Sequence, residues 1–214
     1  VVGVGDVSKR ILLGRKLRGL DPARLGVETA WQSQILEGRY MLGLATGAYP
    51  TDAALRGITD MSKNHDMMLE AIDIMEKVWK AEPFSVEGKY WNAGYPEADP
   101  KKKLRDVRPW GGDIHMAMTG LSAPSPSIAF AGTHGFIPAS VYAGNEFLKS
   151  HFETYRDKMT EAGRTSDRSA HRVVRDVIVA ETDEEARKLA IEGGIGDGWK
   201  AYIKPTYARF DVLK

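Results

Sequence analysis

The strongest candidate for ligand binding in the sequence is a serine-bearing turn at residues 120–127, which reads GLSAPSPS. Ser125 is a favoured N-cap residue and Pro126 a favoured first helical residue, so the pattern predicts a short helix that begins here and runs to about Ala131. The free N–H groups and the positive dipole end of a helix start can hold a phosphate, and the hydroxyls of Ser122 and Ser125 would add donors. The same residues are also typical of a plain helix cap without a ligand, and the sequence by itself favours that simpler interpretation.

Other reactive patterns are missing from the sequence. The five histidines show no H-x-x-x-H spacing, so we predict no metal site. No G-x-S-x-G turn marks a serine nucleophile. The chain has no cysteine, which excludes disulfides, thiolate metal sites and cysteine nucleophiles and is compatible with the cytoplasm, the location that we expect.

Charge and hydropathy argue against two classes of partner. Lys plus Arg number 30 against 29 Asp plus Glu, a formal net charge of +1, whereas a protein that binds nucleic acid usually carries a clear basic excess. The three lysines that start at Lys101 are more typical of a solvated surface. No apolar run approaches the roughly 18 residues of a membrane helix. We therefore predict neither a nucleic-acid nor a membrane partner for this 214-residue chain, which is long enough for one domain with a sizeable core.

Strand-like and helix-like segments alternate along the chain and would position these residues. Apolar runs predict strands at residues 11–14, 39–45, 114–118, 136–141 and 173–180. Helices are expected between Asp21 and Gly38, at about 62–81, at 145–163, and from a T-x-x-E capping box at Thr182 onward. The first helix carries an apolar stripe of Val27, Trp31 and Ile35. The second has an apolar face that we assign to core packing, made of Met68, Ala71, Ile72, Met75, Val78 and Trp79.

Two glycine-containing segments interrupt this alternation. Residues 82–109 contain four prolines and two glycines and are predicted to be irregular. A connection of this length is typically a lid or a partly disordered segment, so we treat 82–109 as an insertion or lid within a single domain formed by residues 1–214. The glycine-rich stretch 193–198 follows a helix and has no phosphate-loop lysine, so it is predicted to be a flexible loop.

The alternation predicts an α/β fold with parallel strands and right-handed crossovers. An open doubly wound sheet and a closed (β/α)8 barrel both satisfy it, and periodicity does not decide between them. The five or so expected strands are fewer than the eight of a barrel, and the chain is shorter than the roughly 250 residues typical of that fold.

Five short segments, in order along the chain, match a known pattern. They read QILEGRYMLGLATG at 34–47, EAIDIMEKVW at 70–79, FSVEGKYW at 84–91, RPW at 108–110 and TDEEA at 182–186. Each match is weak by itself. Together they resemble the bacterial-luciferase family of flavin-dependent oxidoreductases, with the limonene-monooxygenase-like two-component group as the nearest members.

The resemblance implies a fold and an incompleteness. Family members form a (β/α)8 TIM barrel, in which residues 11–14 would be about the third strand. The first strand–helix units and the final unit of that barrel have no counterpart in this sequence. Because a half-open parallel barrel would leave sheet edges exposed, we expect the natural protein to be longer.

The resemblance also implies an activity. A cytoplasmic flavoprotein monooxygenase of this kind would use reduced FMN, supplied by a separate flavin reductase, and dioxygen to oxidise a small apolar organic substrate. A homodimer would be typical. Three alternatives remain: a deazaflavin (F420)-dependent oxidoreductase that transfers hydride on the same fold, a non-catalytic flavin-binding protein, and an unrelated doubly wound enzyme.

Cofactor-binding residues follow by position. Active sites of such barrels lie at the C-terminal ends of the strands, which would bring residues 46–49 and the serine-bearing turn to one mouth. The resemblance implies that Ser122 and Ser125 hold the FMN phosphate and that Thr46, followed by Gly47, lies near the flavin ring. His65 stands where some members carry a tyrosine that reaches the phosphate. The simpler alternatives are a Thr46 bonded to its own backbone and an exposed first-turn His65; no catalytic base can be assigned.

Overall fold

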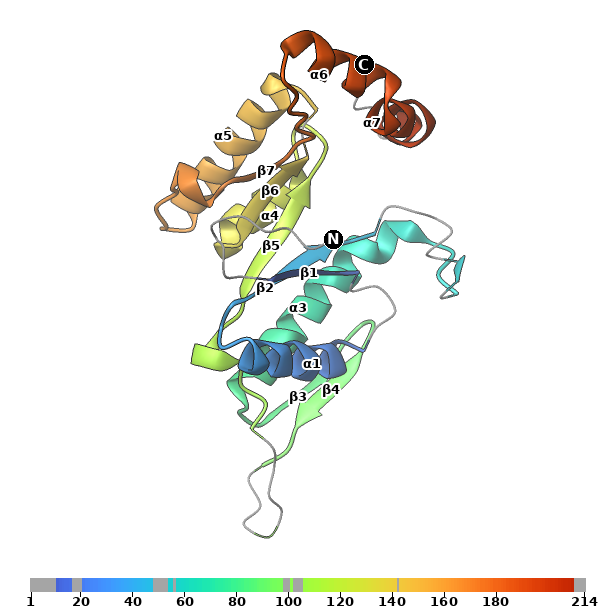
Figure 1. The fold of residues 1–214 in the computed structure, drawn as a ribbon. Coiled ribbons are helices and arrows are strands. Elements are labelled where there is room, and N and C mark those ends of the chain that lie inside the picture. The colour runs from blue at the N-terminus through green and yellow to red at the C-terminus, as the bar shows by residue number, and fades with distance from the viewer. Residues whose placement is uncertain are drawn as a thin grey trace. The chain divides into compact units, whose positions relative to one another are not determined.

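The computed structural model describes residues 11–16, 21–47, 54–55, 57–97, 101, 106–141 and 143–209. The chain divides into two compact units, Val1–Ala117 and Met118–Lys214, and each is described by itself. Strands and helices alternate in both (Figure 1). Neighbouring strands of the larger sheet follow the order β1-β2-β5-β6-β7, and β3 pairs with β4 in a separate two-stranded sheet. The predicted α/β class with parallel strands is confirmed; the described strands do not form a closed barrel.

The first unit pairs two parallel strands and covers them with helices. Its elements are β1 (Ile11–Lys16), α1 (Pro22–Ile35), β2 (Tyr40–Ala45), η1 (Met61–Lys63), α3 (Asn64–Lys80), β3 (Phe84–Glu87), β4 (Asn92–Tyr95) and η2 (Trp110–Gly112). β1 and β2 run in parallel with Ile11 opposite Tyr40 and Lys16 opposite Ala45. Every residue of the predicted apolar face of α3 is buried, which confirms its assignment to the core.

Helix α1 packs against α3 through small side chains. A Cβ atom at Gly26 would lie 3.1 Å from Cγ1 of Val78, and the indole N–H of Trp79 donates to the Gly26 carbonyl at 3.0 Å. The apolar stripe predicted for α1 therefore does not face the core: Trp31 and Ile35 are 67% and 69% exposed. The sequence showed this stripe but not the packing face of α1, because small residues, which carry little hydropathy signal, allow the closest helix contact.

Both predicted boundaries of α1 are confirmed. The Asp21 carboxylate accepts from the Arg24 amide at 2.9 Å, as an N-cap does. At the other end Gly38 has φ +74° and its amide donates to the Ser33 carbonyl. The left-handed conformation favours glycine there, and Trp110 leaves no room for a side chain, since an added Cβ would lie 2.8 Å from its Cδ1.

The second unit repeats the pattern. Its elements are β5 (His115–Gly120), which begins just before the division, α4 (Pro126–His134), β6 (Ile137–Val141), α5 (Asn145–Glu161), η3 (Arg168–Ala170), β7 (Arg172–Val174), α6 (Asp183–Glu192), α7 (Gly194–Gly198), the π-helical turn η4 (Trp199–Ile203) and α8 (Lys204–Arg209). β6 and β7 are parallel, with Val141 opposite Val174. Thr182 caps α6 as predicted, accepting from the Glu185 amide at 3.2 Å. Within the described segments, no helix has the length and apolar character needed to cross a bilayer.

Three segments differ from the sequence prediction. Residues 82–109 contain the antiparallel β3–β4 hairpin, so the segment is not irregular throughout and the described strands number seven in place of about five. The strand predicted over 173–180 ends at Val174, where its partner β6 ends, and Val177 and Val179 are exposed. The glycine-rich stretch 193–198 was predicted to be a loop but forms α7. Only glycine fits at position 196, because a Cβ there would lie 2.2 Å from the Ile191 carbonyl oxygen.

Candidate active site

The serine-bearing turn joins β5 to α4 in the second unit, as predicted. Ser125 is 3% exposed, its hydroxyl oxygen accepts from the Ile128 amide at 3.3 Å, and its carbonyl accepts from the Ala129 amide at 3.0 Å. Gly120 lies directly beneath the first turn of α4, since a Cβ there would lie 2.4 Å from Cγ1 of Ile128 and 2.9 Å from Oγ of Ser125. The helix start is therefore packed rigidly against the end of β5.

The polar groups at this helix start fit a phosphate. The first turn of α4 holds no acidic residue, and the Ser127 amide donates to no other described backbone group. Because Ser125 accepts the Ile128 N–H, its own hydroxyl hydrogen can be donated to a ligand. Ser122 behaves differently: it is exposed and its hydroxyl donates to the Pro124 carbonyl at 3.1 Å. The structure thus leaves Ser125 and the Ser127 amide as the better donors for an anion.

Thr46 and Gly47 follow directly on the carboxyl end of β2 in the first unit. Thr46 is half-buried, and within the described residues its hydroxyl makes no hydrogen bond to the backbone, the simpler role considered for it. Gly47 has φ +82°, a left-handed conformation that favours glycine. Since these residues and the serine-bearing turn belong to different units, their approach to a common mouth stays a prediction.

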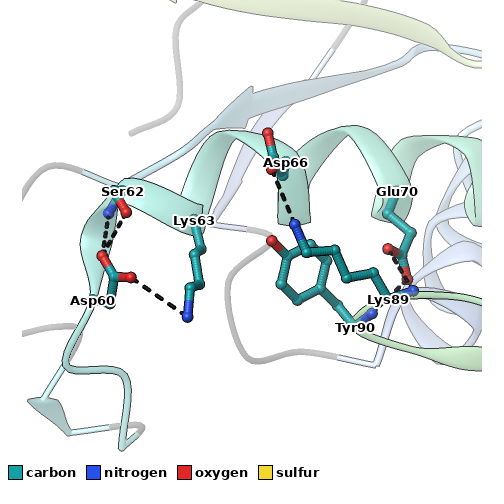
Figure 2. Close-up of polar contacts among 7 residues, drawn as sticks. All are labelled: Asp60, Ser62, Lys63, Asp66, Glu70, Lys89 and Tyr90. Carbon is teal, nitrogen blue, oxygen red and sulfur yellow. Dashed lines mark hydrogen bonds and ion pairs between the residues drawn. The ribbon is translucent and has the colours of Figure 1, made fainter.

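His65 lies in the first turn of α3, at a helix start that is less suited to an anion. Its side chain is half-buried and bonds to no other described residue, whereas Asp66 follows it in the same turn. Asp60 caps the 3-10 turn η1, which leads directly into α3, and pairs with Lys63 at 3.5 Å; Figure 2 draws this pair. Hydrogen bonds from the Ser62 side chain and backbone lower the pKa of Asp60. Two carboxylates near this helix start oppose a phosphate, so a phosphate contact by His65 stays a prediction.

A carboxylate on α3 holds the turn of the β3–β4 hairpin. Glu70 accepts from the backbone amides of Lys89 and Tyr90 at 3.1 and 3.0 Å (Figure 2). It also accepts from the backbone amide of Trp91 at 2.9 Å. Gly88 makes room for it, because a Cβ at that position would lie 2.1 Å from a Glu70 carboxylate oxygen. The β3–β4 hairpin forms the first part of the proposed lid segment 82–109, and this part is therefore attached to α3.

A buried polar network in the second unit was not predicted. His151 of α5 is fully buried; its Nε2 lies 2.6 Å from the Ser122 carbonyl and its Nδ1 2.8 Å from Oγ of Ser140. The same Ser140 oxygen lies 2.7 Å from Nε2 of His171. Burial lowers the pKa of His171, and the nearby His151 and Arg172 lower it further. The two histidines are twenty positions apart in the sequence. The packing of α5 on β6 brings His151 to Ser140, and the pairing of β6 with β7 brings His171 to the same serine.

A cavity opens at the carboxyl ends of β6 and β7. It has a volume of about 420 Å³, and most of its wall is apolar. Its lining comes from the residues that follow both strands and from the last two helical elements: Val141, Ala143, Val174, Arg175, Asp176, Trp199, Ile203 and Tyr207. A cavity of this size accepts a small organic molecule. Among the described residues, no group of three histidine or acidic side chains could hold a metal ion.

Comparisons with known proteins extend over most of the chain. A family model described as Luciferase-like monooxygenase matches residues 16–211. The 3,6-diketocamphane 1,6-monooxygenase of Pseudomonas putida is 44% identical over 211 residues, which cover 90% of this chain and 56% of that protein. The 2,5-diketocamphane 1,2-monooxygenase 1 of the same organism is 40% identical over 199 residues, covering 90% of this chain and 55% of that one.

A solved structure shows the same arrangement. It is the oxygenating constituent of the 3,6-diketocamphane monooxygenase from the CAM plasmid of Pseudomonas putida, described as a type II Baeyer-Villiger monooxygenase and solved in complex with FMN. It matches with a TM-score of 0.87 and 45% identity over 95% of this chain and 58% of that one. The chain spans little more than half the length of the relatives that it matches.

Proposed function

Because this chain belongs to the luciferase-like monooxygenase family, we propose that it forms part of a flavoprotein that uses reduced FMN and dioxygen to oxidise a small apolar substrate. The observation that carries the proposal is the similarity, over 95% of the chain, to a monooxygenase structure that contains FMN. The parallel strand pairs β1–β2 and β6–β7 belong, in this proposal, to a (β/α)8 barrel. The F420-dependent alternative has no comparable support.

The start of α4 is the proposed binding site for the FMN phosphate. The Ser127 amide and the Ser125 hydroxyl would donate to it, and the positive end of α4 would favour its charge. Thr46 and Gly47 at the end of β2 are proposed to approach the flavin ring. FMN, when bound, supplies the activation of oxygen; the residues of this chain bind it, orient it and exclude water.

The cavity at the ends of β6 and β7 is the proposed substrate site. Its apolar wall suits a compact molecule that binds by shape more than by charge. The relatives' names point to bicyclic diketones of the camphane type, so we propose an alicyclic ketone as the substrate class. A Baeyer–Villiger oxidation of such a ketone inserts one oxygen atom from dioxygen beside the carbonyl and reduces the other to water.

The proposal is tested with the whole protein, chemically reduced FMN and a panel of alicyclic ketones under ¹⁸O₂. We expect a lactone that carries one ¹⁸O atom, detected by mass spectrometry, and no product without dioxygen. Product formed anaerobically with reduced F420 would instead establish hydride transfer. FMN binding without any ¹⁸O incorporation across the panel would point to a non-catalytic flavin-binding protein.

Chemically reduced FMN replaces the second component in that assay. A separate flavin reductase is part of the proposal, because two-component enzymes receive reduced flavin from a partner. The cytoplasmic location expected from the cysteine-free sequence belongs to the proposal as well, since reduced nicotinamide for such a reductase is available there.

A homodimer is also proposed, with the exposed face of α1 as the contact. Val27, Trp31 and Ile35 lie on this face beside a groove of about 250 Å³ that Arg108 helps to line. Because large exposed apolar patches mark interaction sites, we expect Trp31→Asp to convert a dimer to a monomer in sedimentation velocity. Leu189→Asp, on the exposed side of α6, is the matched control and should stay dimeric. A monomeric wild type, or a dimer that survives Trp31→Asp, would contradict the proposal.

A further inference from the structure

Four polar groups in the second unit form one continuous chain of hydrogen bonds. It runs from the Ser122 carbonyl to His151, from His151 to the Ser140 hydroxyl, and from there to His171, with separations of 2.6, 2.8 and 2.7 Å. His151 and Ser140 are both 0% exposed. Because a buried polar group without a partner is destabilising, a chain in which both imidazole nitrogens of His151 are paired constrains every member.

With a neutral His151, the acceptor at one end sets the direction of the whole chain. A carbonyl oxygen can only accept, so Nε2 of His151 must carry a hydrogen. In the neutral imidazole Nδ1 is then an acceptor and receives the Ser140 hydroxyl hydrogen. The Ser140 oxygen in turn receives the Nε2 hydrogen of His171. Ser140 and His171 thus hold His151 in the one neutral tautomer that can donate to Ser122.

The receiving carbonyl belongs to the turn that leads into α4. Ser122 lies between Gly120, which packs beneath the helix, and the N-cap Ser125. Its hydroxyl donates to the Pro124 carbonyl, so the carbonyl and the hydroxyl of Ser122 both take part in hydrogen bonds that shape the turn. The turn conformation in turn fixes where the amide of Ser127 points.

We propose that His151 is a positioning residue, which holds the 120–125 turn so that the start of α4 presents its donors to a phosphate. The inference rests on the proposed function, in which that phosphate belongs to FMN. In this proposal His151 itself touches neither cofactor nor substrate. Ser140 and His171 act indirectly, because their hydrogen bonds keep His151 in the tautomer that donates to Ser122.

Two substitutions of similar size separate this role from simple filling of the core. The amide nitrogen of glutamine can reach the position of Nε2 and still donate to the Ser122 carbonyl. Asparagine is one methylene shorter and can replace only Nδ1, next to Ser140. His151→Gln should therefore preserve the turn, whereas His151→Asn should release it although both are polar and buried.

The first measurement uses the whole protein without flavin. Nitrogen-15 NMR of wild-type His151 is expected to show the neutral Nε2–H tautomer. In His151→Asn we expect the amides of Ile128 and Ala129, which donate to Ser125, to exchange with solvent at least about tenfold faster, the change that corresponds to one lost hydrogen bond. The Glu185 amide at the start of α6 should exchange at the wild-type rate, as should both α4 amides in His151→Gln. An Nδ1–H tautomer, or equal exchange in the two variants, would overturn the proposal.

The second measurement compares FMN with riboflavin, which lacks the phosphate. His151→Asn should lower the affinity for FMN at least about tenfold and leave that for riboflavin unchanged, whereas His151→Gln should bind both as the wild type does. An equal loss of both ligands would mean that His151 is only structural. If the wild type binds neither flavin, the proposed function fails, while the exchange and tautomer results still decide whether His151 holds the turn.

Discussion

Replacing Glu70 with alanine is expected to lower the free energy of unfolding by about 2 to 3 kcal/mol and to expose the β3–β4 hairpin to proteases. Its carboxylate accepts three backbone amides within 3.1 Å, and hydrogen bonds to a charged group contribute about 1.5 to 3 kcal/mol each when well buried. The site is partly exposed, which reduces the sum. Chemical denaturation measures the first effect, and limited proteolysis with mapping of cuts in residues 84–95 measures the second.

Two further variants test the same contact. Glu70→Gln keeps one carbonyl oxygen, which can still accept from Tyr90 and Trp91 but not from Lys89, so an intermediate loss is expected. Gly88→Ala leaves Glu70 intact and places a Cβ 2.1 Å from its carboxylate oxygen, so it should mimic Glu70→Ala. Asp73→Ala, which removes only an exposed ion pair with Lys77, should change stability by less than about 0.5 kcal/mol. Wild-type stability in Glu70→Ala would mean that the hairpin does not depend on this carboxylate.

The Glu70 contact also shows where sequence reasoning stops. Segments 70–79 and 84–91 were matched to the family as two separate patterns. The structure joins them, because the Glu70 of the first binds the backbone of the second and requires its Gly88. A pattern of residue types contains no distances, so the reason for either residue could not be seen. The lid role of 82–109 stays a prediction, now with its first half attached to α3.

Local signals were read correctly where neighbouring residues determine the structure. Asp21 and Thr182 cap their helices, and Ser125 caps α4 ahead of Pro126, because an N-cap bond reaches only three residues along the chain. Contacts between distant segments were missed. The face of α1 that packs on α3 is built on Gly26, which no hydropathy pattern selects.

The same distinction between local signals and distant contacts holds for the candidate site. The position of Ser125 at a helix start followed from its neighbours, and the family followed from ordered motifs. The role of Ser122 did not, because its carbonyl is bound by a histidine 29 positions later and its hydroxyl by Pro124. The sequence assigned no role to His151 or His171, because neither belongs to a pair of histidines with the spacing of metal ligands. They act together only through Ser140, whose side chain the fold of the second unit places between them.

Gly120→Ala is expected to lower the affinity for FMN by about 100-fold or more. The new methyl group would lie 2.4 Å from Cγ1 of Ile128 and 2.9 Å from Oγ of Ser125, so the first turn of α4 must move away from β5. A displacement of about 1 Å at a binding group can cost about 100-fold in function. The overpacking itself should lower stability by only about 1 to 3 kcal/mol. Isothermal titration with FMN and riboflavin, beside a thermal unfolding curve, separates the two effects.

Relief of the clash provides the strictest control. Gly120→Ala combined with Ile128→Ala removes the nearest side-chain atoms, so the double variant should recover most of the FMN affinity although it carries two core changes. Gly194→Ala, where an added Cβ meets nothing within 4 Å, should bind FMN as the wild type does. If Gly120→Ala lowered the affinity for riboflavin as much as that for FMN, the start of α4 would not bind the phosphate. If it weakened neither, the phosphate site would have to lie elsewhere, because Gly120 lies directly beneath the first turn of α4.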